Sequence, residues 1–455
     1  MDLIPTAQTP GDDAAKLSDA ADATLIRRLH RALARREATS DGPPPVAAEG
    51  EGRARHVRDG GPYTWTAPHG WTPGDVRPGA GLLDGWTLAV KDLIALAGRP
   101  IGAGSALRDH AAAETVTAEV VARLISAGAE VAGTTALHEF AFGTTGINRH
   151  TGTPDNPNAP GRITGGSSSG SAAAVADGSA RLSLGTDTGG SIRIPAALCG
   201  VAGFKPSFGL YPAAGVFPLS ASLDHVGLHA RNVADLCLAH RALGHTVGEA
   251  VGRIRFGVLT SDVEAADGPV REAMERALAR LGEAGHDLVP VEGPAPELVF
   301  ATSTAIMFTE AAAVHEPTLG SLHYGPDVYG RLATGAMIGG TTYHNALIAR
   351  QGLIAQVRAL LADVDALIGP TVPLLAPTVE AATQDGALPA RLVANTRLAN
   401  VTGLPAVSLP LPTAGPPIGL QLTGLADSDV LGLAAVVESV VGGSQTAMTD
   451  CLTGR

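Results

Sequence analysis

Two Gly-Gly-Ser turns lie close together in the sequence, at residues 165–167 and 189–191. A pair of glycines lets the backbone aim several N–H groups at one point and lets another group approach closely. A serine that follows such a pair can place its hydroxyl where a reacting carbonyl group would bind. The two turns therefore predict paired hydroxyl chemistry, provided that a base lies nearby.

Lys91 is the candidate base for these hydroxyls. It follows the apolar stretch 87–90 and precedes Asp92. An exposed lysine has a pKa near ~10.4, so its amine is neutral at pH 7 only where burial or nearby positive charge lowers that pKa. Because residues 87–90 predict a short buried strand, we expect at least partial burial of Lys91. The pattern is equally compatible with a lysine that ends the strand and pairs with Asp92.

Three known motifs fit the glycine and serine region less well. A P-loop fails because the Gly-Lys-Ser/Thr ending is missing, and no G-x-G-x-x-G opens a helix here. Residues 166–170 match the G-x-S-x-G nucleophile elbow, with Ser168 at its centre. That elbow needs a hydrophobic strand directly before it, whereas residues 156–164 predict a loop. The pattern therefore does not favour Ser168 as a nucleophile.

The elements around these residues alternate between strands and helices. A helix of small residues and a short strand separate the two turns, and Gly128 is the expected stop signal of a helix that leads into a strand. Such alternation predicts an α/β fold with a large mixed central β-sheet flanked by α-helices. Further predicted strands are 87–90, 130–135, 253–259, 365–370, 405–412 and 418–424, and further predicted helices are 117–128, 270–285 and 351–361.

The chain has 455 residues, and its first 80 differ from the rest in composition and in the pattern of apolar residues. Ser18 could cap an amphipathic helix, and residues 39–62 are rich in proline, glycine and charge, which is typical of a linker. We therefore expect an N-terminal helical appendage and linker over 1–80 and a catalytic domain over 81–455.

Composition excludes several classes of function. The net charge of −12 argues against nucleic acid or an anionic membrane surface as a partner. No signal peptide and no run of 18 apolar residues is evident, so a cytoplasmic location is expected. The three cysteines lack CxxC spacing and the histidines lack metal-ligand spacing, so neither a disulfide framework nor a metal site is expected.

Residues 165–178 and 184–209 together closely resemble the signature region of the amidase signature family. The similarity continues in the same order from about Leu82 to Leu422, which makes it more specific than any single motif. The usual family signature is Gly-Gly-Ser-Ser-Gly-Gly-Ser, and Ser169 replaces one glycine here. The other matching segments are 86–92, 137–157, 222–227, 367–377 and 399–410.

This resemblance implies the fold of that family and a Ser–Ser–Lys triad. Ser191 would be the nucleophile, and Ser167 would carry a proton between Ser191 and Lys91. The family holds this relay serine on a cis peptide bond, here between Gly166 and Ser167. The resemblance thus implies hydrolysis of a carboxamide through an acyl-enzyme on Ser191, with Lys91 as the base and without a metal or an organic cofactor.

The resemblance also implies roles for the residues around the nucleophile. The backbone N–H groups around Thr188, Gly189, Gly190 and Ser191 would form the oxyanion hole, which stabilises the tetrahedral intermediate. The resemblance further implies that an ion pair and one more hydroxyl support the turn that contains the nucleophile. These supporting residues are Asp187, Arg193 and Ser168.

Selectivity for the substrate is expected to come from residues 137–149, 198–219 and 300–345. Within these segments five residues are candidate walls of a substrate pocket, and a role in core packing is at least as compatible with each of them. They are Phe142, Phe217, Ile306, Tyr324 and Tyr343.

Other interpretations stay open at this point. The same signature occurs in the glutaminase (A) subunit of tRNA-dependent amidotransferases, which needs partner subunits. A non-catalytic binding protein on the same fold belongs to another class, and the intact Lys91, Ser167 and Ser191 argue against it. A serine–histidine–aspartate triad is also open, although Lys91 makes a histidine unnecessary. The expected partner is a small-molecule amide, and a homodimer is compatible with the sequence.

Overall fold

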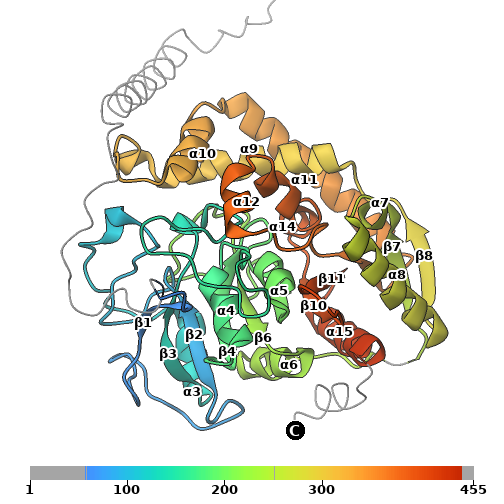
Figure 1. The fold of residues 1–455 in the computed structure, drawn as a ribbon, viewed down its shortest axis with the longest axis horizontal. Helices are drawn as coiled ribbons and strands as arrows, with labels where there is room; N and C mark the ends of the chain where they lie inside the picture. The colour runs from blue at the N-terminus through green and yellow to red at the C-terminus, as the bar shows by residue number, and fades with distance from the viewer. Residues whose placement is uncertain (1–56, 58, 251, 443–455) are drawn as a thin grey trace, which may run out of the picture.

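A mixed sheet of eleven strands crosses the described part of the chain, residues 57, 59–250 and 252–442, in this computed structural model (Figure 1). Parallel and antiparallel pairs both occur: β2 runs parallel to β3 and β4, whereas β4 runs antiparallel to β6. In spatial order the strands are β1 (Tyr63–Thr66), β3 (Glu130–Thr135), β2 (Thr87–Lys91), β4 (Leu182–Asp187), β6 (His225–Ala230), β5 (Ala202–Lys205), β10 (Ala406–Leu411), β11 (Ile418–Thr423), β9 (Ala366–Pro370), β7 (Arg255–Leu259) and β8 (Asp287–Val291).

Helices cover both faces of this sheet, so that β4 is buried along its whole length. On one face lie α4 (Ser169–Ala176) and α5 (Arg193–Cys199), and on the other lie α6 (Val233–Ala242) and α15 (Asp427–Gly442). The side chains of β4 alternate between these faces, as the pleat requires. Ser183 Oγ donates to the carbonyl oxygen of Ser171 in α4, whereas Leu184 belongs to the apolar core with Leu236 of α6.

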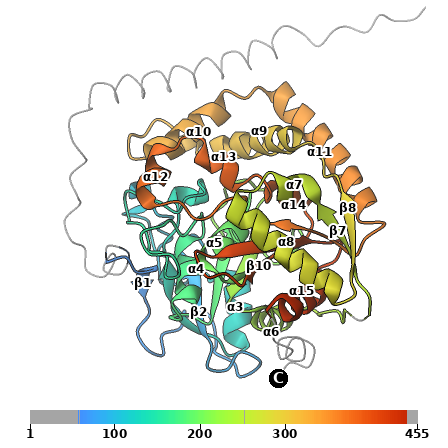
Figure 2. The ribbon, with the colours of Figure 1, turned by 45° about the vertical axis from the view of Figure 1, so that its right-hand side comes forward.

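Three long helices form a layer over one end of the sheet, at the top of Figures 1 and 2. They are α9 (Pro296–Val314), α10 (Pro326–Ala336) and α11 (Gly340–Leu360), and α9 packs against both of the others and against α14 (Arg397–Thr402). The remaining helices of the described residues are α3 (Glu119–Ser126), α7 (Thr260–Glu264), α8 (Gly268–Glu283), α12 (Val379–Gln384) and α13 (Leu388–Leu392), with short 3-10 turns at Ala106–Arg108, Glu139–Ala141 and Glu316–Thr318.

The α/β prediction is confirmed, and the predicted strands and helices named above occur with small shifts at their ends. The helix and the strand expected between the two Gly-Gly-Ser turns are α4 and β4. The helix predicted over 351–361 is longer, because α11 already begins at Gly340. Its first half carries few buried apolar side chains, so it lacks the periodic pattern by which a helix is recognised.

The first 80 residues contribute to the sheet itself. Within the segment expected to be appendage and linker, β1 pairs antiparallel with β3 at the edge of the sheet. The helix expected after Ser18 lies outside the described residues, and the domain boundary at residue 80 stays a prediction.

One of the described helices, α9, is long and apolar enough to cross a membrane by length and composition alone. Core helices of soluble proteins pass the same test. Its Ile306 and Ala311 are fully buried within the protein core.

Candidate active site

Lys91 ends β2, the third strand from one edge of the sheet, and its side chain is completely buried. The Nζ atom donates to the hydroxyls of Ser167 at 2.8 Å, Ser168 at 2.9 Å and Thr186 at 2.9 Å. Asp92 instead accepts hydrogen bonds from Thr64 and from the N–H of Gly102. The structure therefore supports a buried lysine amine that faces serine hydroxyls, and not a lysine that pairs with Asp92.

Burial has a large effect on the charge of Lys91. Removal from water disfavours the ammonium form and lowers the pKa of Lys91 from 10.5 to about 7, against the opposing influence of the Asp187 and Asp224 carboxylates. A substantial fraction of the amine is therefore neutral at physiological pH. This is the condition that a lysine must meet in order to accept a proton.

Ser167 and Ser168 both contact Lys91, but they differ in where the hydroxyl proton is donated. Ser168 Oγ donates its proton to the carbonyl oxygen of Thr186 at 3.1 Å, so toward Lys91 it acts as an acceptor. The Ser167 hydroxyl has Lys91 as its one hydrogen-bond partner among the described residues. Because a hydroxyl both donates and accepts, Ser167 is the serine able to pass a proton to the lone pair of a neutral Lys91.

Ser191 lies in the turn between β4 and α5, directly beside the first Gly-Gly-Ser turn. Its carbonyl oxygen accepts a hydrogen bond from the N–H of Ser168 at 3.3 Å, and the Gly166–Ser167 peptide bond is cis. Ser191 is 7% exposed, and its hydroxyl makes no hydrogen bond to any described residue. The structure thus brings the two turns together, but it contains no direct hydrogen bond between the Ser167 and Ser191 side chains.

A buried ion pair holds the second turn. Arg193 Nη2 lies 3.0 Å from Asp187 Oδ1, its Nε donates to Asp187 Oδ2 at 3.1 Å, and both side chains are fully buried. Burial would raise the pKa of Asp187, but the Arg193 guanidinium and the Lys205 ammonium hold it well below its usual range. Asn400 completes the network by donating to Asp187 Oδ1 at 2.7 Å. A charged pair with this many hydrogen bonds fixes the loop between β4 and α5.

The Asp187 carboxylate also accepts a hydrogen bond from the backbone of the turn, which leaves only some of the N–H groups there free to face a substrate. Asp187 Oδ1 accepts from the N–H of Gly190 at 2.8 Å, whereas the N–H groups of Gly189 and Ser191 make no hydrogen bond to a described residue. Gly190 has a φ of 129°, and a Cβ there would lie 2.2 Å from Thr396 Oγ1. Glycine is therefore required at this position, and Gly189 and Ser191 are better placed than Gly190 as oxyanion donors.

Sequence reasoning missed several residues that shape this site. Thr186 is one of the three hydroxyls on Lys91, and Thr396 Oγ1 donates to the carbonyl oxygen of Gly189 at 2.7 Å. Asn400, which donates to Asp187 Oδ1, is a third. Thr188 was predicted for its backbone N–H alone, and its hydroxyl donates to Asp224. Thr186 lies on the strand predicted between the two turns, and Asn400 lies in the segment 399–410 that resembles the family. The sequence therefore indicated where these residues lie but not which groups they contact.

The five candidate pocket residues do not form one group. Phe217 and Tyr324 pack together with Phe140 and His315 in an aromatic cluster. The other three lie elsewhere: Phe142 packs edge-on against Phe308, Ile306 is fully buried, and Tyr343 donates to Glu310 at 2.8 Å.

None of the histidines in the described residues hydrogen-bonds to the side chain of Ser167 or Ser191. His138 Nε2 lies 2.8 Å from Asp327, and His229 Nε2 lies 3.0 Å from the carbonyl oxygen of Ile192. Burial lowers the pKa of His229 to about 4 and also lowers that of His138. The geometry therefore favours Lys91 over a histidine as the base.

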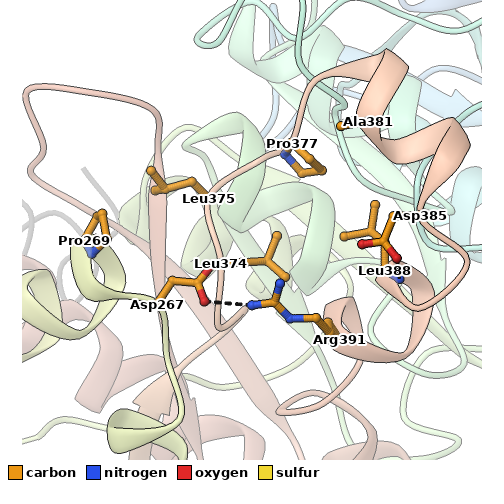
Figure 3. Close-up of a pocket in the computed structure, with 9 residues that line it drawn as sticks. All are labelled: Asp267, Pro269, Leu374, Leu375, Pro377, Ala381, Asp385, Leu388 and Arg391. Carbon is orange, nitrogen blue, oxygen red and sulfur yellow. Dashed lines mark hydrogen bonds and ion pairs between the residues drawn. The ribbon is translucent and has the colours of Figure 1, made fainter.

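A separate cavity of about 240 Å³ lies between α8 and the helices α12 and α13 (Figure 3). Leu374, Leu375 and Leu388 form its apolar wall, and Asp267 pairs with Arg391 across it at 2.7 Å. None of the candidate site residues lines this cavity, so it is not the site that contains Lys91.

Comparison with known proteins shows which family this chain resembles. Residues 75–433 match the Amidase family model. An indoleacetamide hydrolase of Pseudomonas savastanoi is 42% identical over 212 residues, which is 46% of either chain. The A-type subunit of the glutamyl-tRNA(Gln) amidotransferase of Halobacterium salinarum is 34% identical over 79% of this chain and 96% of its own length. A solved crystal structure of an amidase aligns with a TM-score of 0.76 and 32% identity, and the alignment covers 94% of this chain and 99% of that one.

These matches differ in extent. The alignment with the indoleacetamide hydrolase spans less than half of that relative, whereas the family model covers most of this chain, including both Gly-Gly-Ser turns and Lys91. The solved amidase extends the likeness to 94% of this chain. The chain therefore belongs to the amidase signature family.

Proposed function

We propose that this chain hydrolyses the amide bond of a small molecule through an acyl-enzyme on Ser191. The observation that carries the proposal is the buried Lys91 amine, held 2.8 Å from a serine hydroxyl that has no other partner among the described residues. Family membership and the name of the indoleacetamide hydrolase support amide hydrolysis as the reaction. A cytoplasmic location and a homodimer stay predictions.

In the first half of the reaction Ser191 Oγ attacks the carbonyl carbon of the amide. The Ser191 proton moves to Ser167 Oγ, and Ser167 passes its own proton to the neutral Lys91 amine. The carbonyl π electrons move onto oxygen, which becomes the oxyanion of a tetrahedral intermediate. For this step the Ser191 hydroxyl must come within hydrogen-bond distance of Ser167, a contact that tightens when substrate binds.

Collapse of the intermediate breaks the carbon–nitrogen bond. The oxyanion electrons restore the carbonyl, and the proton held on Lys91 returns through Ser167 to the departing nitrogen, which leaves as ammonia or an amine. A water molecule then attacks the acyl-enzyme, and one of its protons passes through Ser167 to Lys91. The bond between Ser191 Oγ and the acyl carbon breaks, and this proton returns from Lys91 through Ser167 to Ser191 Oγ. The products are a carboxylic acid and free Ser191, so Lys91 ends each cycle neutral.

The N–H groups of Gly189 and Ser191 supply the oxyanion hole in this proposal. They are fixed before charge develops, because Asp187 holds Gly190 and Thr396 holds the carbonyl group of Gly189. One such donor is worth on the order of 3 kcal/mol in other hydrolases. Ser168, Asp187 and Arg193 act as support for these groups.

The glutaminase component of an amidotransferase is a second candidate. The match to the amidotransferase component of Halobacterium salinarum, which covers 96% of that relative, favours it. This function requires partner subunits, so co-purification from the source cells distinguishes the two candidates.

The test is labelling of the purified chain by a fluorophosphonate, which reacts with activated serines, together with ammonia release from a panel of amides. We expect the wild type to be labelled at Ser191 and Ser191→Ala to lose labelling and about 10⁴-fold or more in kcat/KM. Ser428→Ala, which removes an exposed serine hydroxyl of α15 that is bonded to Asp429, is the matched control. A wild type that neither reacts with the fluorophosphonate nor releases ammonia from any amide would refute the hydrolase hypothesis. The hypothesis of a non-catalytic binding protein would then remain.

A further inference from the structure

Arg397, the first residue of α14, is a buried cation next to the oxyanion turn. Its side chain is only 8% exposed. A Cβ built on Gly189 would lie 3.9 Å from Arg397 Cγ and 3.1 Å from Met307 Cε. Arg397 and Met307 therefore cover the Gly189 side of the turn whose N–H groups are the proposed oxyanion donors.

The guanidinium of Arg397 is only partly used by the protein. Nη1 donates to Ser303 Oγ at 2.8 Å, to Thr304 Oγ1 and to the carbonyl oxygen of Phe300, and the guanidinium stacks over the Phe300 ring at 4.3 Å. The Nε atom is buried and has no hydrogen-bond partner among the described residues. Nη2 makes no hydrogen bond to a described residue either, so two donor positions of the planar group stay open.

No acidic side chain in the described residues pairs with Arg397. The other buried arginine beside the turn, Arg193, has the Asp187 carboxylate at 3.0 Å, and the neighbouring Arg331 has Asp327 at 3.0 Å. Burial, together with the nearby positive charge of Arg331, lowers the pKa of Arg397 to about 10. A buried guanidinium without a counter-charge is costly for a fold, and buried charges are normally paired.

We propose that Arg397 binds a carboxylate of the substrate, so that the preferred substrates are primary amides whose acyl part carries a second, ionised carboxyl group. This inference rests on the proposed function and adds the substrate class to it. A carboxylate matches the unused, adjacent Nε and Nη2 donors of the guanidinium, which form the fork that binds two oxygens side by side. Because the anion would enter a site that is largely closed to water, this contact contributes to selectivity for charged acyl groups.

The experiment compares matched pairs of substrates by ammonia release. The half-amides of malonic, succinic and glutaric acid carry the second carboxylate, and the corresponding diamides do not. For at least one chain length we expect the wild type to favour the half-amide over its diamide in kcat/KM. In Arg397→Gln the half-amide should lose about 10- to 100-fold more in kcat/KM than the diamide, chiefly through KM.

Two further variants separate recognition from packing. Arg397→Lys keeps the positive charge and should recover part of the preference for the half-amide, whereas a purely structural role would not depend on charge in this way. Arg391→Gln removes an arginine six positions earlier that pairs with Asp267 in the separate cavity, and it should leave the preference unchanged. Succinate should inhibit the wild type competitively, which tests the site even where Arg397→Gln fails to fold.

The proposal is overturned if the wild type turns over half-amides no better than diamides at every chain length, or if Arg397→Gln lowers both equally. Failure of the proposed function looks different, since the fluorophosphonate would then leave Ser191 unlabelled. In that case calorimetric binding of succinate to the wild type and to Arg397→Gln still decides whether Arg397 holds a carboxylate.

Discussion

Lys91 Nζ lies 2.8 Å from Ser167 Oγ, although 76 residues separate the two in the sequence. The contact arises because β2 runs beside β4 and because α4, which follows the first Gly-Gly-Ser turn, packs across both strands. A Cβ on Gly170 of α4 would lie 2.3 Å from the carbonyl oxygen of Pro62, so small residues are needed for this close approach. The helix thus delivers the serine hydroxyl to the end of the lysine strand.

The pH dependence of catalysis follows from the charge of Lys91. Only its neutral amine accepts a proton, and burial lowers the pKa of Lys91 to about 7. We therefore expect kcat/KM for a neutral amide to fall about tenfold per pH unit below pH 7 and to level off above it. The measurement is kcat/KM from pH 5.5 to 9, and a flat profile over this range would contradict the assignment of Lys91.

Lys91→Met is the companion variant, because methionine fills a buried position without a charge. It should abolish amide hydrolysis, and near-normal activity would reopen the histidines. It also changes stability in a defined direction. In the unfolded chain lysine stays protonated up to about pH 10, so the free energy of unfolding of the wild type should rise between pH 7 and 10, and the variant should lack this rise.

The two serines on Lys91 should differ sharply when each is replaced. Ser167→Ala removes the proposed relay and should lower kcat by roughly 10²- to 10⁴-fold. Ser168→Ala removes a hydroxyl whose proton is already bound by the carbonyl group of Thr186. It should therefore cost mainly stability, about 1–3 kcal/mol for the buried groups left unpaired.

Steady-state kinetics and denaturant unfolding of both variants make this comparison. If Ser168→Ala loses as much kcat as Ser167→Ala, the relay cannot be assigned to Ser167 alone, and the G-x-S-x-G pattern centred on Ser168 must be reconsidered.

The sequence alone was sufficient to predict the parts of the site that lie within contiguous motifs. The strand before Lys91, the helix and strand between the turns, and the Asp187 and Arg193 pair all lie within short segments with strong local patterns. The pairing of Thr396 with Gly189 spans 207 residues and depends on how α14 packs. A threonine or an arginine in a helical segment carries no local signal for such a contact, so Thr396 and Arg397 could not be found from the sequence.

The buried pair of Asp187 and Arg193 should be far more sensitive to substitution than an exposed pair. Asp187→Asn leaves the Arg193 guanidinium buried without its counter-charge, and we expect the free energy of unfolding to fall by about 3–5 kcal/mol. Asp287→Asn is the matched control, since Asp287 pairs with Arg253 at the surface and should cost about 1 kcal/mol or less. Chemical denaturation of both variants measures the difference, and equal losses would show that the buried pair does not hold the turn.

Thr396 should position the oxyanion turn without touching the substrate amide itself. Thr396→Val keeps the shape of the side chain and removes the hydroxyl that holds the carbonyl group of Gly189. Within the described part of the chain, the Gly189–Gly190 peptide group then keeps only the hydrogen bond from its N–H to Asp187, so the turn is held less firmly. Because small displacements of oxyanion donors are costly, we expect kcat to fall about tenfold with little change in KM. Thr402→Val is the control, since among the described residues the Thr402 hydroxyl bonds only to the carbonyl oxygen of Leu398 within the same helix. An equal effect of both variants on kcat would mean that Thr396 acts through the stability of α14 rather than through the turn.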